Sequence, residues 1–204
     1  AQLSPQALAI LQQHQVDGAT YFTNAVGTRT RGLDLRLDYK QELSQGRRWH
    51  LSAAFQRAAT RITRVNRAPP VLGVDMTDLI LDPYTRVTMA SGQPRSALKL
   101  WTRYSTPGYD VAFNLNRFGS YASTYGSTPV AFGARWTLDV QFAYHWDKNT
   151  TLTVGGTNVR NARPAQWGVT DDALTGAGKP IPYSQYAPFG YNGAAYYVRL
   201  GMRF

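Results

Sequence analysis

The feature of this sequence that most limits its fold is a two-residue alternation of apolar and polar side chains, which recurs along most of the chain. Between Leu33 and Lys40 every odd-numbered residue is apolar and every even-numbered residue is charged. Successive side chains of a β-strand point to opposite faces, so this pattern predicts a strand with one apolar face and one face in water. A helix would need apolar residues three or four positions apart.

The alternation predicts an all-β, antiparallel fold of about seven strands. They are expected near residues 29–42, 48–63, 95–106, 109–121, 132–146, 150–160 and 192–204. One short helix is predicted before them, because Pro5 suits a first helical position, Leu8 and Leu11 follow at helical spacing, and Gly18 is a suitable stop.

The predicted connections alternate between tight turns, near residues 45, 107 and 148, and long segments, at about 66–94, 121–130 and 161–190. All the short links therefore fall at one end of the sheet, as in outer-membrane barrels. Aromatic residues gather on the apolar faces beside the tight turns, as interfacial girdles do: Trp49, Tyr104, Tyr109, Tyr144 and Trp146. These features favour a transmembrane β-barrel segment over a soluble lipocalin-like or sandwich domain, although local alternation alone is compatible with both.

Composition removes several classes of function. The longest apolar runs, such as Ala7 to Leu11, are too short for a transmembrane helix, and the absence of cysteine excludes disulfides and thiolate sites. The net charge of +10 is spread along the chain, which favours a solvated or lumenal face over a nucleic-acid partner. The first residues lack a signal-peptide pattern, so we expect an exported protein of this kind to have been processed or cut.

Three segments carry a family resemblance. Tyr21 to Ala25, with Thr28 to Leu35, resembles a segment within the barrels of TonB-dependent receptors, and Ala195 to Phe204 is similar to the C-terminal strand of that family. Thr153 to Pro164 looks like the penultimate strand, where Val159 and Arg160 stand in place of the more usual Leu and Phe.

This resemblance implies that residues 29–204 are the C-terminal strands of a receptor barrel of about 22 strands in the outer membrane. Residues 1–28 are then an extracellular loop segment with the short helix. The implied function is TonB-coupled import of a scarce ligand, commonly a ferric siderophore, sometimes cobalamin or a saccharide. The implied partners are the rest of the barrel and its plug, TonB, the barrel-assembly machinery, membrane lipid and the small-molecule ligand, with no cofactor.

The candidate ligand contacts are aromatic and basic residues of the long segments, suited to an anionic or aromatic chelate. Ordinary loop packing would use the same residues: Tyr84, Arg86, Tyr121, Tyr125, Arg163, Trp167, Tyr183 and Tyr186. Four further arginines, Arg36, Arg57, Arg135 and Arg199, are expected to line the lumen.

Other chemistry has weaker support. Asp75, Asp78 and Asp82 are candidate ligands of a Ca²⁺ ion, but their spacing fits no standard cation loop, and solvated acids are expected instead. The alternative to a receptor is an autonomous small outer-membrane barrel, structural, porin-like or a lipid hydrolase. A hydrolase would use pairs such as His50 with Ser52 or His145 with Asp139, yet no nucleophile motif is present, so no catalytic or metal residues are predicted.

The last strand also predicts an assembly signal, formed by the alternating residues Tyr196, Val198, Leu200, Met202 and Phe204. Deleting Phe204 from the full-length protein is expected to lower the yield of folded barrel in the outer membrane, because the resemblance assigns the terminal aromatic to recognition by the assembly machinery. Heat-modifiable migration on gels measures that yield, and an unchanged yield would contradict the role.

Overall fold

The computed structural model describes residues 5–17, 24, 26–66, 81–125, 128–167, 182–184 and 186–203. Apart from the helices α1 (Pro5–Gln13) and α3 (Pro83–Ser91) and the 3-10 turn η1 (Ser44–Gly46), the elements are strands. They are β1 (Val26–Glu42), β2 (Arg48–Val65), β3 (Ser96–Ser105), β4 (Tyr109–Phe118), β5 (Tyr121–Tyr125), β6 (Thr128–Phe132), β7 (Arg135–His145), β8 (Thr150–Thr157) and β9 (Ala195–Met202). No helix in these ranges is long and apolar enough to cross a bilayer.

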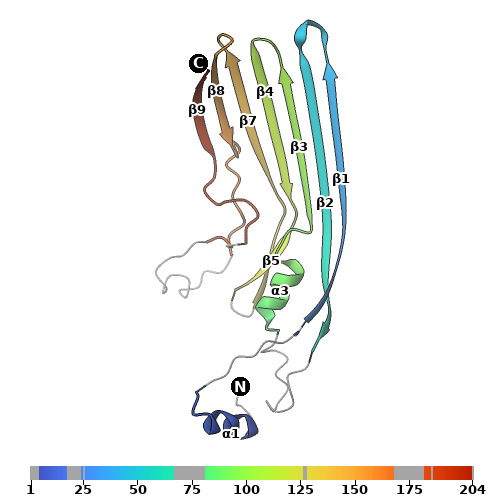
Figure 1. Ribbon diagram of the computed structural model, residues 1–204, viewed down its shortest axis with the longest axis vertical. Coiled ribbons are helices and arrows are strands. Elements are labelled where there is room, and N and C mark those ends of the chain that lie inside the picture. The colour runs from blue at the N-terminus through green and yellow to red at the C-terminus, as the bar shows by residue number, and fades with distance from the viewer. Residues whose placement is uncertain are drawn as a thin grey trace. The chain divides into compact units, whose positions relative to one another are not determined.

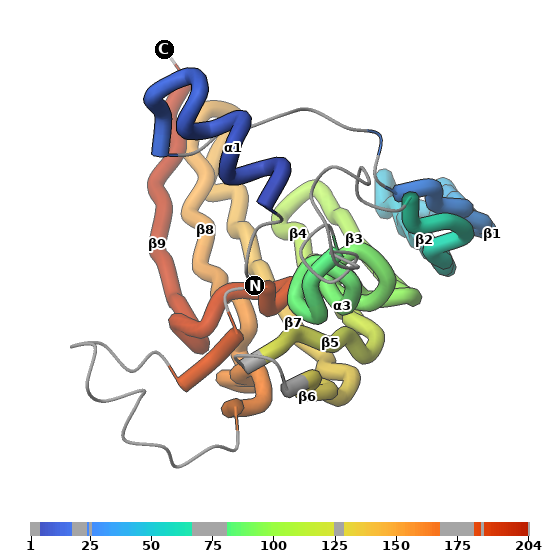
Figure 2. The backbone as a smooth tube through the Cα atoms, turned by 90° about the horizontal axis from the view of Figure 1, so that it is seen from below, coloured from blue at the N-terminus to red at the C-terminus, as the bar shows by residue number. Residues whose placement is uncertain are grey.

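Seven strands form one sheet in the order β1-β2-β3-β4-β7-β8-β9, and β5 pairs with β6 in a separate hairpin (Figure 1). From β2 to β9 each neighbouring pair is antiparallel. Within the described residues β1 and β9 are the two edges of the sheet, so this segment of barrel is not closed. Figure 2 shows β7, β8 and β9 following one another and β5 beside β6.

The described chain divides into two compact units. One contains residues 1–31, 59–92 and 122–130, with α1 and α3; the other contains residues 32–58, 93–121 and 131–204, with most of the large sheet.

The register places apolar residues in continuous rows across the large sheet. One row crosses six strands, because neighbouring partners in an antiparallel ladder share a face; its members are Trp49, Tyr104, Val111, Phe142, Val154 and Val198. Val198 is 73% exposed on this face, and Leu37 of β1 is 60% exposed. So many exposed large apolar side chains indicate a face that contacts lipid or another apolar partner.

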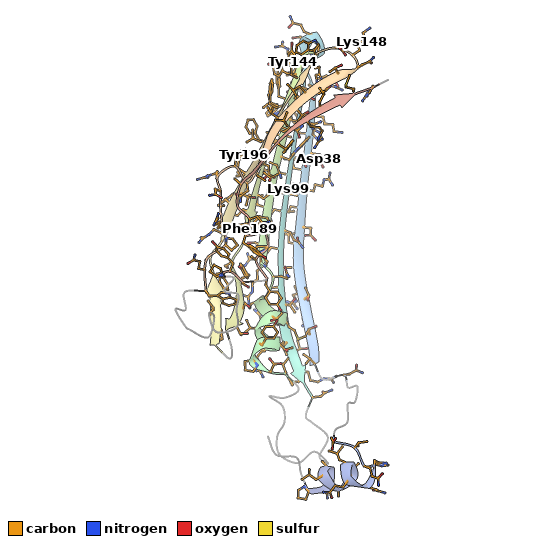
Figure 3. All side chains as sticks on the ribbon, turned by 90° about the vertical axis from the view of Figure 1, so that its left-hand side faces the viewer. Asp38, Lys99, Tyr144, Lys148, Phe189 and Tyr196 are labelled. Carbon is orange, nitrogen blue, oxygen red and sulfur yellow. The ribbon has the colours of Figure 1, made fainter. Side chains whose placement is uncertain are left out.

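The opposite face is polar. Figure 3 labels Asp38 and Lys99, which belong to it, and Tyr144 and Tyr196, which belong to the apolar face. Asn114 pairs with Asp139, and its side-chain amide donates to the Asp139 carboxylate over 2.8 Å. Such a face needs water, since burying these groups in a dry core would be costly.

Side-chain chemistry fixes the three tight turns. In the β1–β2 turn Gln45 and Gly46 both have positive φ, as a tight hairpin requires. The hydroxyl of Thr106 accepts from the backbone N–H groups of Gly108 and Tyr109. Asp147 accepts from the N–H groups of Asn149 and Thr150, each over 2.7 Å, and these bonds lower the pKa of its carboxyl.

Two adjacent glycines let the last strand pack closely on β8. Gly155 pairs with Tyr197 and Gly156 with Tyr196. A Cβ at Gly155 would lie 2.6 Å from the Tyr197 ring, and one at Gly156 would lie 2.8 Å from the Tyr196 ring. The two tyrosines therefore occupy, on opposite faces, space that a side chain on β8 would need.

The observed strands agree with the predicted ones, and the short N-terminal helix is present. Three details were wrong. The helix ends at Gln13 and not at Gly18, and the expected loops at 121–130 and 66–94 contain the β5–β6 hairpin and α3 respectively. The polar composition of these segments concealed the regular structure. Phe204, Gly18 and most of Tyr21 to Ala25 lie outside the described residues.

The two-faced sheet predicts an asymmetric response to charge. Phe113→Arg places a cation in the middle of the apolar face and should destabilise the full-length barrel by about 2–4 kcal/mol, the range for a cation near the bilayer midplane. The control, Asn116→Arg, puts the same charge on the polar face of the same strand and should cost much less. Urea unfolding in detergent micelles gives both values, and equal destabilisation would contradict the assignment of the faces.

Candidate functional site

The polar face carries a cluster of basic and aromatic groups toward the tight-turn end. The His50 ring lies edge-on to the Trp101 ring at 4.8 Å, and the Arg103 guanidinium lies 5.7 Å from the same ring. Asp38 Oδ1 is 3.9 Å from His50 Nε2. A hollow of about 420 Å³ lies on this face, lined by Arg36, Asp38, His50, Ser52, Lys99 and Trp101. This cluster can hold polar or anionic groups facing the sheet.

The pairs considered for hydrolysis do not form. His50 Nε2 has no hydrogen-bond partner in the described structure. His145 lies 3.4 Å from Asp110 rather than beside Asp139, and its Nδ1 is 3.2 Å from the Thr151 hydroxyl. Among the described residues no group of three or more acidic or histidine side chains is placed to hold a metal ion.

Side-chain hydrogen bonds of Asp139 and Asn158 form a junction just after β8 ends, where the long segment 161–194 begins. Asp139 accepts from the Asn158 N–H (2.8 Å) through one oxygen and from the Asn114 amide through the other. The Asn158 side chain in turn donates to the Ala162 carbonyl and accepts from the Ala162 N–H. Asn158 and Asn161 have φ values of 49° and 51°, a region that asparagine tolerates better than most residues.

The same junction holds the far end of the segment. Asn161 Oδ1 accepts from the Ala194 N–H over 3.2 Å, just before β9 begins. A Cβ at Gly193, where φ is 81°, would lie 2.3 Å from that Asn161 oxygen. Both ends of the long segment are therefore tied to one point of the sheet.

A second cluster at the long-segment end is aromatic. Tyr121 stacks on Phe132 with ring centroids 4.8 Å apart, and Trp167 meets Phe132 edge-on at 5.2 Å. Phe132 is 1% exposed and Tyr121 6%. Burial also raises the pKa of the Tyr121 hydroxyl. Tyr121, Phe132 and Trp167 thus form a small aromatic core.

The predicted ligand contacts occupy different settings. Tyr84 and Arg86 are exposed on α3 in the first unit, and Tyr125 belongs to β5, with its side chain outside the description. In the second unit Arg163 is exposed, Tyr121 is buried, and Trp167, Tyr183 and Tyr186 are half-buried. Of the eight, the structure brings together Tyr121 and Trp167, through Phe132.

Asp82, one of the three acids considered for Ca²⁺, is the N-cap of α3. Its carboxylate accepts from the Thr85 N–H over 2.9 Å and from the Thr85 hydroxyl over 2.8 Å. These bonds lower its pKa, and they explain this acid without a cation. Asp75 and Asp78 lie outside the described residues.

Sequence reasoning missed two features of the site. In the alternating run from Leu98 to Tyr104, Trp101 is an apolar residue at a position on the polar face. This exception was the available sequence signal of the His50–Trp101–Arg103 cluster. The hydrogen bond from the Asn158 N–H, just after β8, to Asp139 of β7 joins residues that are far apart in the chain, and spacing alone did not indicate it. Of the four arginines expected in the lumen, Arg57 was placed wrongly: its register with Ser96 puts it on the apolar face, in line with Phe55.

An open antiparallel sheet with one lipid-compatible face, one polar face and all its tight turns at one end defines a segment of a transmembrane β-barrel. The sequence profile of the family described as "TonB dependent receptor-like, beta-barrel" matches residues 6–159. The chain therefore belongs to the TonB-dependent receptor β-barrel family.

One solved structure agrees with this assignment of fold. The chain is similar to the siderophore receptor PiuA from Acinetobacter baumannii, with 18% identity and a TM-score of 0.51 over 69% of this chain and 19% of that one. It also matches FpvA of P. aeruginosa bound to heterologous pyoverdines (16% identity, TM-score 0.48) and the FpvAI–pyocin S2 complex (15%, 0.47), each over 68% of this chain and 16% of the other. The chain thus spans about a fifth of the length of these receptors. A comparison with curated protein sequences gives no match.

Removing the carboxylate of Asp139 should loosen the junction. Asp139→Ala leaves the Asn158 N–H and the Asn114 amide without their acceptor, at an expected cost of about 1–3 kcal/mol. Trypsin cleavage of the full-length barrel after Arg160 should then become faster. Asp110→Ala, at the tight-turn end of the same face, is the control and should leave that cleavage unchanged; equal acceleration in both variants would contradict a local role for Asp139.

Proposed function

We propose that this chain forms the C-terminal strands of an outer-membrane receptor that imports a ferric siderophore by TonB-coupled active transport. The observation that carries the proposal is the two-faced sheet in a chain of the TonB-dependent receptor family. The similarity to a solved siderophore receptor supports the fold and suggests the class of ligand.

The two faces supply the two environments that such a receptor needs. The apolar rows suit contact with lipid, while the polar face, with its His50–Trp101–Arg103 cluster, suits a wet lumen that holds a plug. Partners outside this chain are the plug, TonB and, during assembly, the barrel-assembly machinery.

The ligand is proposed to meet the long-segment end of the sheet. Arg163 is exposed beyond the end of β8, and Arg86 is exposed on α3 of the other unit; guanidinium groups form strong, directional bonds to anionic chelates. Aromatic surface comes from Trp167, Tyr183 and Tyr186 in the unit of Arg163 and from Tyr84 in the unit of Arg86. The buried Tyr121 contributes by packing on Phe132.

Uptake by cells tests this function directly. A strain that lacks the full-length receptor should lose accumulation of ⁵⁵Fe supplied on the cognate siderophore, and a plasmid copy should restore it only while the proton-motive force is intact. Parallel arms with labelled cobalamin and a labelled oligosaccharide distinguish the other ligand classes. Restored uptake of either of these, or uptake that resists an uncoupler, would overturn the proposal.

Binding tests the contact residues. Arg163→Gln in the full-length receptor should weaken siderophore binding about tenfold, the loss expected for one good charge-assisted contact. Lys148→Gln removes the same charge at the tight-turn end and should leave affinity unchanged. Fluorescence titration of the purified receptor measures both, and equal affinities of Arg163→Gln and wild type would remove Arg163 from the site.

A further inference from the structure

Arg57 and Arg117 stand on the apolar face of the sheet, where a charge is costly unless it has a partner. Arg57 of β2 pairs with Ser96, and Arg117 of β4 pairs with Leu98 on one side and Trp136 on the other. Each arginine stands two positions after the end of the apolar run on its face of the strand, Arg57 after Phe55 and Arg117 after Leu115. They therefore share the face that carries the apolar rows.

Their depths are similar, since the register puts Arg57 level with Ser96 and Arg117 level with Leu98, two residues nearer the tight turns. Arg57 lies eight residues beyond Trp49, and Arg117 lies eight beyond Tyr109, the aromatic residues nearest the tight turns. Counted with both ends, each stretch is nine residues long, within the roughly 9–11 residues with which a tilted strand crosses a bilayer. Both guanidinium groups thus fall at the far boundary of the band, and Trp136, beside Arg117, is the kind of residue found in an interfacial girdle.

The two side chains flank one hydroxyl. Arg117 Nη1 donates to Ser96 Oγ over 3.3 Å, and Ser96 is the ladder partner of Arg57. Strands β2 and β4 both neighbour β3 and so lie about 10 Å apart, and the two-residue offset between the arginines puts their backbones roughly 12 Å apart. Long guanidinium side chains can converge over that distance on one tetrahedral anion.

No acid compensates this charge in the described structure. Neither Arg57 nor Arg117 takes part in a salt bridge among the described residues. The sequence has no acidic residue between Glu42 and Asp75, an interval that also contains Arg61, Arg64 and Arg67.

We infer that Arg57, Arg117 and Ser96 form a binding site on the outside of the barrel for the phosphate group of an outer-leaflet lipid. Guanidinium groups bind phosphate by paired, charge-assisted hydrogen bonds, and the serine hydroxyl adds a donor. Phe55, Leu98 and Leu115 continue the same face toward the membrane interior, where acyl chains lie. That combination of anionic and apolar complementarity fits a phospho-lipid rather than a phosphate ion from solution. The inference rests on the proposed membrane orientation.

The test uses the full-length receptor in detergent and lipid A as the probe, supplied with both phosphates or enzymatically dephosphorylated. Native mass spectrometry measures the bound fraction. Arg57→Gln/Arg117→Gln should weaken binding of phosphorylated lipid A about thirtyfold, from the typical contribution of a basic residue at an anionic membrane surface. Arg57→Lys/Arg117→Lys, which keeps the charge but loses the planar fork, should weaken it less than tenfold.

Arg48→Gln/Lys148→Gln is the matched control, because it removes two positive charges at the opposite end of the sheet. It should bind like wild type. The site would be overturned by unchanged binding in the Arg57→Gln/Arg117→Gln variant or by an equal loss in the control. It would also be overturned if dephosphorylated lipid A bound equally well, or if millimolar inorganic phosphate displaced the bound lipid A.

Heat-modifiable migration and siderophore uptake by the same variants separate this inference from the proposed function. If the double variant folds and transports but retains lipid A like wild type, the lipid site alone fails. If the double variant does not fold, the single variants Arg57→Gln and Arg117→Gln are each expected to bind about fivefold more weakly, and wild-type affinity in both would overturn the site.

Discussion

Backbone hydrogen bonding in an apolar solvent is the constraint on which this structure depends. A strand in lipid has no water for its N–H and C=O groups, so each must pair with a neighbouring strand. The ladders from β2 through β9 satisfy this requirement internally. The outward edges of β1 and β9 are compatible with a bilayer only when further strands cover them, which agrees with a chain that spans about a fifth of the related receptors.

Once the backbone is paired, the pleat sends alternate side chains to opposite environments, and each face acquires its own role. The apolar rows suit contact with lipid; tyrosine and tryptophan lie at their tight-turn ends, and Arg57 and Arg117 lie at their other ends. The polar face is organised by hydrogen bonds and ring contacts, such as those of His50 with Trp101 and of Asn114 with Asp139. One alternating pattern thus provides both a membrane surface and a lining for a wet lumen.

The long-segment end depends on a different kind of interaction. Asp139 and Asn158 end β8 with side-chain hydrogen bonds, and Asn161 ties the return of the chain to the same point. An aromatic cluster in the same compact unit is formed by Tyr121, Phe132 and Trp167. A segment rich in glycine and proline therefore leaves and re-enters the sheet at a defined place, which a receptor needs if its outer residues are to present a reproducible surface.

The sequence by itself determined the strands, their two faces, the tight turns and the family resemblance, because these follow from local periodicity and from turn chemistry at fixed spacing. The sequence also supplied the candidate contact residues, since aromatic and basic types stand out in polar segments, and their role in binding stays a prediction. Only the tertiary structure decided that Tyr121 is buried against Phe132 and that Arg57 belongs to the apolar face beside Ser96. It also decided that Asp139 accepts a hydrogen bond from Asn158 and does not pair with His145. These outcomes depend on which strand pairs with which and in what register, and that pairing joins residues far apart in the chain, where local spacing carries no information.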